Sequence, residues 1–258
     1  SKPRHDTRRL PHTGSCLRLA LLPSLPFRMI INPYRFAAGG TFGNASRSFD
    51  GTDDCILVSP DTAIDNFFSG GATFAAWIKT NDGSDTNRII DKRTNSGGSS
   101  GWILYLDDVS GGNCDLAFRQ DFSTREYVAQ TTSREITLGS WVHIAVVYDS
   151  SSTTNNATIY VDGSSVGVTE VVAPLGSSSS DSSKKLSIGD IDPDFTAARR
   201  AFDGNIADVR LYDADIGATE VANLAAGTDY QTNLVGWWLD NDDDVLDNAG
   251  TNDGTNNG

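Results

Sequence analysis

The residues in this sequence best suited to chemistry are carboxylates at three acid–glycine corners. The stretch "FDGTDD" offers Asp50, Asp53 and Asp54, and hard oxygen ligands on a flexible loop are the kind that Ca²⁺ binds. The other corners are Asp162-Gly163 and Asp203-Gly204, each beside a strand-like stretch. An Asp-Gly pair also suits a tight turn without a ligand, because glycine accepts a positive φ and aspartate bonds nearby backbone. Turn formation suffices for Asp162-Gly163, whereas "FDGTDD" leaves cation binding and solvated turns both open.

Tryptophan rings form a second group of candidates, because an exposed ring can stack on a sugar. Trp77 and Trp141 lie in alternating apolar stretches, which predicts that both are core residues. Trp102 follows a Gly/Ser loop, and Trp237 and Trp238 are adjacent. Neighbours on a strand point to opposite faces, so one of that pair faces outward or is covered by another strand. Trp102 and Trp238 are therefore the ligand-binding candidates, although core packing is the favoured alternative for both.

No group of residues resembles a catalytic centre. Glycoside hydrolysis needs a pair of carboxyl groups as nucleophile and acid, and no two of the glutamates are closely spaced: Glu126, Glu135, Glu170 and Glu220. His143 lies inside the hydrophobic stretch "WVHIAVVYD", where a satisfied sheet residue is favoured over a general base. The sequence has no cluster of His and Cys residues, so a transition-metal site is not expected. We expect a non-enzymatic protein.

The charge is unevenly distributed along the chain, whose formal net charge is −14. Residues 1–28 carry six Lys or Arg and one acid, so the remainder is strongly acidic. Such a body repels nucleic acid and anionic membranes, and neither is expected as a partner. No stretch approaches the roughly 20 apolar residues of a transmembrane helix. For Cys55 and Cys114, two free thiols are the favoured prediction, and a disulfide between them is the alternative.

Strand signals recur at short intervals from Phe49 onward and predict an all-β fold. The stretches 102–107 and 115–120 flank a Gly-Gly-Asn turn, which predicts a hairpin. Many short strands with frequent turns are typical of a two-sheet antiparallel jelly-roll sandwich. One short helix is expected near residues 218–226, with Thr219 as its cap and Gly227 as its end.

The ordered strand signals resemble a known superfamily, the laminin-G-like, concanavalin-A-like lectin and glucanase jelly rolls. The resemblance rests on the series "FDGTDD", "TFAAWIKT", "GSWVHIAVVYD", "IYVDGSSVG", "LSIGD", "FDGNIADVRLYD" and "TEVANLAAG". It implies two curved sheets, glycan or protein binding and, in many members, a calcium ion at one edge. By this resemblance Asp50, Asp54 and Asp208 would form the calcium site. The run 240–247 is a second acidic candidate, but like charges in sequence are usually solvated.

Two features depart from the usual layout of this superfamily. Within the C-terminal segment 233–258, residues 233–254 resemble the segment that normally opens the domain, a Trp strand followed by an Asp-rich loop. We expect this segment to complete a jelly roll over residues 46–258, although a truncated second repeat or strand donation to a neighbour stays open. At the other end, residues 1–28 are interpreted as a basic leader or upstream read-through, with translation starting at Met29, and 29–45 as an N-terminal arm.

The residues after Met29 resemble the start of bacteriophage structural proteins that carry this domain. The leading hypothesis is therefore a non-enzymatic virion surface protein, either a capsid decoration or a fibre or tail component. It would bind a glycan or cell-surface polysaccharide and other virion proteins, as a homo-oligomer. The alternative is a secreted bacterial carbohydrate-binding or adhesion module, and a glycoside hydrolase is the least favoured. The expected location is the virion surface or the extracellular space.

Overall fold

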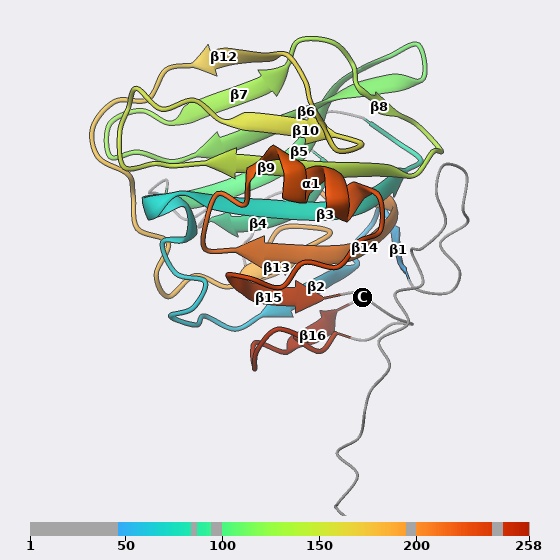
Figure 1. Cartoon of the computed structure of the whole chain (residues 1–258). Helices are drawn as coiled ribbons and strands as arrows, with labels where there is room; N and C mark the ends of the chain where they lie inside the picture. The colour runs from blue at the N-terminus through green and yellow to red at the C-terminus, as the bar shows by residue number, and fades with distance from the viewer. Residues whose placement is uncertain (1–45, 84–86, 94–99, 195–199, 239–244, 258) are drawn as a thin grey trace, which may run out of the picture. The chain divides into compact units, whose positions relative to one another are not determined.

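The computed structural model describes residues 46–83, 87–93, 100–194, 200–238 and 245–257 (Figure 1). These residues form two antiparallel sheets and one α-helix, so the prediction of an all-β, two-sheet jelly-roll sandwich with a short helix is confirmed. The expected leader and arm, residues 1–45, lie outside the described residues. Within the described part of the chain, no helix is long and apolar enough to cross a membrane.

Sheet A has seven strands, six of which form a continuous ladder. Their order is β1 (Arg47–Asp50), β14 (Asp203–Tyr212), β3 (Ala72–Thr80), β9 (Val142–Tyr148), β10 (Thr158–Val161) and β11 (Ser164–Ser165). The seventh strand, β15 (Leu234–Trp238), pairs with the second half of β14. The C-terminal segment thus pairs within its own chain, at the same edge where β1 pairs with the first half of β14.

Sheet B has nine strands, and its edge is closed by the end of the chain. The order is β12 (Val168–Val172), β7 (Tyr127–Thr131), β6 (Asn113–Gln120), β5 (Gly101–Ser110), β4 (Asn87–Arg93), β13 (Leu186–Ile188), β2 (Cys55–Val58) and β16 (Gly254–Asn257), with β8 (Ile136–Thr137) paired to β6. The predicted hairpin is β5–β6, and Gly111 and Gly112 both have positive φ at its turn. This is the backbone geometry that favours glycine in a two-residue hairpin loop.

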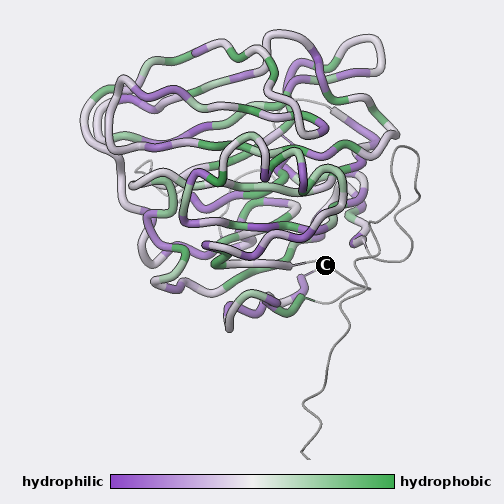
Figure 2. Tube along the Cα trace, viewed as in Figure 1, coloured by the Kyte–Doolittle hydropathy of each residue, from purple (hydrophilic) through white to green (hydrophobic). Residues whose placement is uncertain are grey.

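The core lies between the sheets because alternate residues of each strand point inward. In β3 the side chains of Phe74, Ala76 and Ile78 belong to the main core, whereas Trp77 and Lys79 have the opposite parity. Figure 2 shows hydrophobic and hydrophilic residues interspersed along the chain. The 3-10 turn η1 (Phe67–Gly70) caps one end of this core with its two phenylalanines.

The outer surface of sheet A is partly covered by helix α1 (Gly217–Ala225). Val221 and Leu224 of the helix pack on Ala75 and Ala145 of the sheet. The predicted end at Gly227 is confirmed, since this residue has φ +77° and its N–H donates to the carbonyl of Leu224. The predicted cap was wrong, because the helix begins two residues before Thr219, with Ile216 at its N-cap.

Cys55 and Cys114 are both buried and are not joined in a disulfide, as the favoured alternative predicted.

Candidate functional site

Two tryptophans lie together on the outer surface of sheet A, beside the part that helix α1 covers. Trp77 is in register with His143 of β9 and with Ala207 of β14, and Trp141 directly precedes β9. Both indoles are half-buried and pack around the buried Ala207. We call these four residues, Trp77, Trp141, His143 and Ala207, the tryptophan face. Its two indole rings remain partly accessible on the outer surface of sheet A.

His143 is the buried residue of the tryptophan face, and it contacts Trp77. Its side chain is buried, and its ring meets the Trp77 ring edge-on with 5.3 Å between centroids. Burial, helped by the nearby positive charge of Arg210, lowers the pKa of His143 to about 3. The imidazole is therefore neutral near pH 7, and its Nδ1 has no hydrogen-bond partner within the described residues. This histidine packs against Trp77 and is too buried to act as an exposed base.

A buried polar network borders the face on the β14–β15 side. Asp208 Oδ1 accepts hydrogen bonds from Arg210 Nε at 2.8 Å and from Trp237 Nε1 at 2.7 Å. The Arg210 guanidinium also lies 4.2 Å from the centroid of the Trp237 ring and donates to Asp229. Asp208 has φ +51° at the irregularity in β14 between Ala207 and Arg210. The bulge turns its carboxylate into this network.

The structure does not bring together the three predicted calcium ligands. Asp50 pairs in register with Asp203, and Asp208 lies five residues further along β14, roughly 16 Å away at the rise of a strand. Asp50 and Asp54 instead build a turn: Asp50 Oδ1 accepts from the Thr52 N–H at 2.7 Å, and Asp54 Oδ2 accepts from the Asp50 N–H at 3.0 Å. Nor is any group of three or more His, Cys, Asp or Glu in the described ranges placed to hold a metal ion.

The second acidic candidate, the run 240–247, lies mostly outside the described residues. Its last member, Asp247, is buried and accepts hydrogen bonds from the backbone N–H groups of Trp237, Ala249 and Asn252. This carboxylate therefore organises the connection between β15 and β16 and has little capacity left for a ligand.

The predicted sugar-stacking role of Trp102 and Trp238 needs correction. Trp102 is 1% exposed and packs against the rings of Phe67 and Phe68. Trp238 is fully buried and donates its indole N–H to the carbonyl of Asn252. Neither ring offers a face to a ligand, because both point between the sheets. The tryptophans predicted to be core, Trp77 and Trp141, are the ones that lie outside it.

The sequence contains a pattern that places Trp77 and Trp141 on the outer face of the sheet. In "TFAAWIKT" Trp77 has the parity of Lys79, and in "SWVHIAVVY" Trp141 has the parity of His143. Both polar residues mark the strand face that is turned away from the core. Strand parity therefore locates the tryptophan face better than the general tendency of tryptophan to be buried.

The outer surface of sheet B carries charged residues that are largely buried. Arg88 and Asp91 form an ion pair of 3.2 Å, and Arg88 also lies over the ring of Tyr105. Burial raises the pKa of Asp91 to about 6, against the opposing effect of Arg88. Asp121 accepts from both Arg93 and Arg119. Since Arg88, Asp91 and Tyr105 are at most 9% exposed, this surface is less accessible than the tryptophan face.

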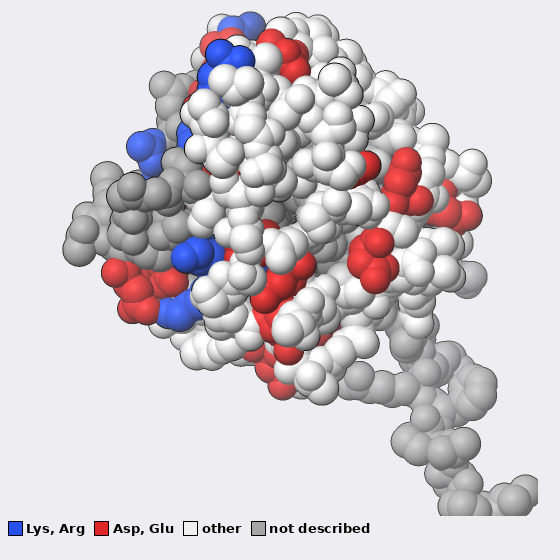
Figure 3. All heavy atoms as spheres, turned by 90° about the vertical axis from the view of Figure 1, so that its left-hand side faces the viewer, with Lys and Arg blue, Asp and Glu red and all other residues white. Residues whose placement is uncertain are grey.

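The charge of the surface agrees with the acidic composition. Figure 3 shows one side of the molecule, on which acidic side chains are spread more widely than basic ones. Of the glutamates, Glu126 pairs with Arg119 at 3.6 Å, Glu170 lies in β12 and Glu220 lies in helix α1.

Comparison with known proteins identifies the fold and its relatives. The family model described as concanavalin A-like lectin/glucanases superfamily matches residues 50–222. A Bacteroides ovatus protein described as carbohydrate-binding is similar in structure, with a TM-score of 0.58 and 21% identity; the match covers 83% of this chain and 58% of that one. The heptameric SAP-like pentraxin of Limulus polyphemus has a TM-score of 0.51 and 19% identity, covering 69% and 80% of the two chains. None of the curated proteins matches this chain in sequence.

Proposed function

Because the chain belongs to the concanavalin A-like lectin/glucanases superfamily, we propose that it is a non-catalytic, extracellular carbohydrate-binding or adhesion module. The family match and the similarity to a protein described as carbohydrate-binding support this role. The virion role, suggested by the residues after Met29, has no support among these comparisons. The carbohydrate-binding alternative therefore replaces it as the leading hypothesis.

The observation that carries the proposal is the tryptophan face. Flat, partly exposed aromatic rings offer a large contact area at low entropic cost, and binding sites combine such rings with a few placed polar groups. Lys79 and Asn205, which are half-buried and in register with each other, have the same strand parity as Trp77 and Ala207. In this proposal the indoles stack on a pyranose ring while the lysine and the amide bond its hydroxyl groups.

The ligand that suits this face is a neutral glycan. The chain has a formal net charge of −14, and a field of this sign opposes the approach of polyanions such as uronate-rich polysaccharides. Stacking on indole rings needs no charge on the sugar. Binding would consequently change little with ionic strength.

The experiment is a binding survey on neutral and acidic polysaccharides by affinity electrophoresis, followed by calorimetry on the best oligosaccharide. Trp77→Ala and Trp141→Ala should each weaken binding by about tenfold or more, as expected for aromatic residues that dominate an interface. Leu175→Ala is the matched control, because Leu175 is 51% exposed and lies in the loop after β12, away from the tryptophan face.

Two results would count against the proposal in different ways. Unchanged affinity in both tryptophan variants would reject the tryptophan face as the site while leaving glycan binding intact. A flat response to every polysaccharide would reject glycan binding itself. Homo-oligomerisation and a calcium requirement stay predictions, to be checked by light scattering and by repeating the survey with a chelator.

A further inference from the structure

One lysine lies inside the sandwich. Lys92, near the end of β4, has a side chain with 0% exposure. It is in register with Trp102 on β5, whose ring packs against Phe67 and Phe68. A lysine in such an apolar setting is rare, because removing an ammonium group from water carries a large free-energy penalty.

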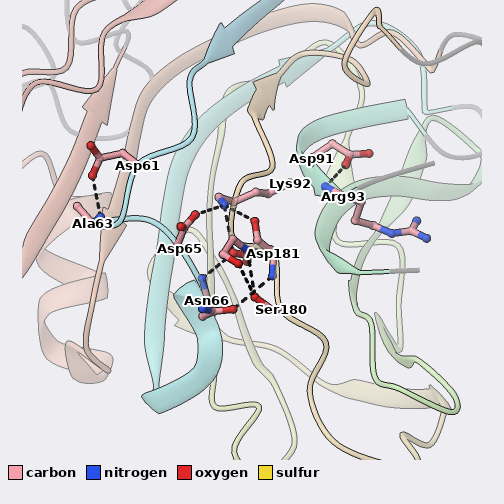
Figure 4. Close-up of polar contacts among 10 residues, drawn as sticks. Asp61, Ala63, Asp65, Asn66, Asp91, Lys92, Arg93, Ser180 and Asp181 are labelled. Atoms are coloured by element: carbon pink, nitrogen blue, oxygen red, sulfur yellow. Dashed lines mark hydrogen bonds and ion pairs between the residues drawn. The ribbon is translucent and has the colours of Figure 1, made fainter. Parts of the chain in front are cut away.

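Two carboxylates face the Lys92 ammonium in this setting (Figure 4). Its Nζ lies 3.0 Å from Asp65 Oδ1 and 3.1 Å from Asp181 Oδ1, and it also donates to the Asp181 carbonyl. Asp65 belongs to the loop before η1 and is 17% exposed, whereas the Asp181 side chain is 3% exposed. Asp181 is further fixed by the Asn66 N–H, which donates to its Oδ1 at 2.5 Å, and by Asn66 Oδ1, which accepts from its N–H.

This arrangement holds the groups of an amide condensation in place. A nucleophilic nitrogen and a carboxyl group are held together by a rigid fold, which replaces the encounter of two molecules. Burial raises the pKa of Asp181, against the opposing effect of Lys92, and this favours the neutral carboxyl form. A second carboxylate, Asp65, lies within hydrogen-bonding distance of the same nitrogen and can move a proton.

We propose that Lys92 and Asp181 condense to form an intramolecular amide cross-link between β4 and the loop that precedes β13. A proton first moves from the ammonium to the Asp181 carboxylate, which gives a neutral amine and a neutral acid. The Nζ then attacks Cγ of Asp181 while Asp65 takes one of its protons. Asp65 returns this proton to the departing hydroxyl, the C–O bond breaks, and one water molecule leaves. No oxidant or other reactant is required.

One contribution to the free energy of this reaction is the removal of buried charge, which is partly offset because Asp65 loses its ion pair with Lys92. A buried ion pair retains the desolvation penalty of two charges, and its mutual attraction offsets that penalty only in part. The amide is neutral, so condensation removes both charges from the core and releases the water to solvent. The cross-link would also restrict the unfolded chain between two residues that are 89 positions apart.

The test is mass spectrometry of the full chain after purification and storage at neutral pH. The intact mass should be lower than the sequence mass by one water. Because Asp-Gly steps such as Asp162-Gly163 can also lose water, a tryptic digest must locate the loss. The expected product is a branched peptide that joins the segments containing Lys92 and Asp181, with no cleavage after Lys92.

Two variants and one internal control complete the experiment. Asp65→Asn keeps the size of the side chain and removes the proton carrier, so it should retain the full mass and a lysine that trypsin cleaves. Lys92→Met should also keep the full mass, although the unpaired Asp181 will destabilise it. Lys185, which contacts Asp192 and Asp194 on the surface, should form no branched peptide in the wild type, because its ammonium stays hydrated.

A linear Lys92 peptide in the folded wild type, at the mass of the unmodified sequence, would overturn the proposal whatever the variants do. A branched peptide in wild type that persists in Asp65→Asn would overturn the assigned role of Asp65.

Discussion

Trp102 lies in the core and Trp77 on the surface, so alanine substitutions of the two should differ strongly in their effect on the free energy of unfolding. Trp102 is 1% exposed and contacts two phenylalanine rings, so Trp102→Ala leaves a large cavity in the core. Substitutions of this kind cost about 3–5 kcal/mol of the free energy of unfolding. Trp77 is half-buried on the outer surface of sheet A, so Trp77→Ala loses part of its contact area with His143 and Ala207. We expect a loss of about 1–2 kcal/mol there.

The assay is urea denaturation followed by circular dichroism at 25 °C. A third variant, Trp102→Phe, sharpens the comparison, because the indole N–H of Trp102 has no hydrogen-bond partner in the described structure. Removing this unsatisfied donor offsets part of the lost volume, so the phenylalanine variant should be much more stable than the alanine variant. A larger loss of stability in Trp77→Ala than in Trp102→Ala would contradict the core position of Trp102 and the surface position of Trp77.

Three further predictions concern the surroundings of the tryptophan face. Asp208→Ala should lower the free energy of unfolding by about 3 kcal/mol, because it leaves the buried Arg210 guanidinium without the more buried of its two carboxylate partners, Asp208 and Asp229; a loss below 1 kcal/mol in urea denaturation would contradict this. Gly163→Ala should destabilise by about 1–3 kcal/mol, because φ is +77° and a Cβ would lie 3.0 Å from the Ala222 Cα; an unchanged melting temperature would contradict this. His143 takes up protons in the unfolded state below its ordinary pKa of 6.5 but in the folded state only near 3, so stability should fall by up to about 5 kcal/mol as pH drops through that interval. His143→Gln should flatten this part of the pH profile, and an identical profile would exclude the histidine as its source.

The fold could be predicted from the sequence because its signals are local and repeated. The Gly-Gly turn of the β5–β6 hairpin and the glycine at the end of helix α1 each report a backbone conformation that side-chain-bearing residues avoid. The start of the helix was less predictable. Gly217 N–H donates to Asp215 Oδ1, so the side chain that binds the N–H of the first helical residue belongs to Asp215, not to Thr219.

The candidate site was harder to predict, since it depends on long-range register. Asp208 reads as an exposed strand acid by its position after "GNIA", but the bulge in β14 turns it toward Arg210 and Trp237. Lys92 of β4 contacts Asp65 and Asp181, which lie in loops 27 and 89 residues away in the chain. No periodicity within a strand reports such contacts. The parity of Trp77 and Trp141 with Lys79 and His143 indicates an outward position, whereas the usual burial of tryptophan favours the core.

The most direct test of the glycan-binding account is a titration of the ¹⁵N-labelled protein with a neutral oligosaccharide, followed through its tryptophan indole N–H signals. The chain has five tryptophans, so each signal can be assigned by single substitution. If the glycan binds at the tryptophan face, the signals of Trp77 and Trp141 should shift and saturate, while those of the buried Trp102 and Trp238 should stay in place. Saturable shifts confined to Trp102 and Trp238, or a ligand that binds without moving either Trp77 or Trp141, would contradict it.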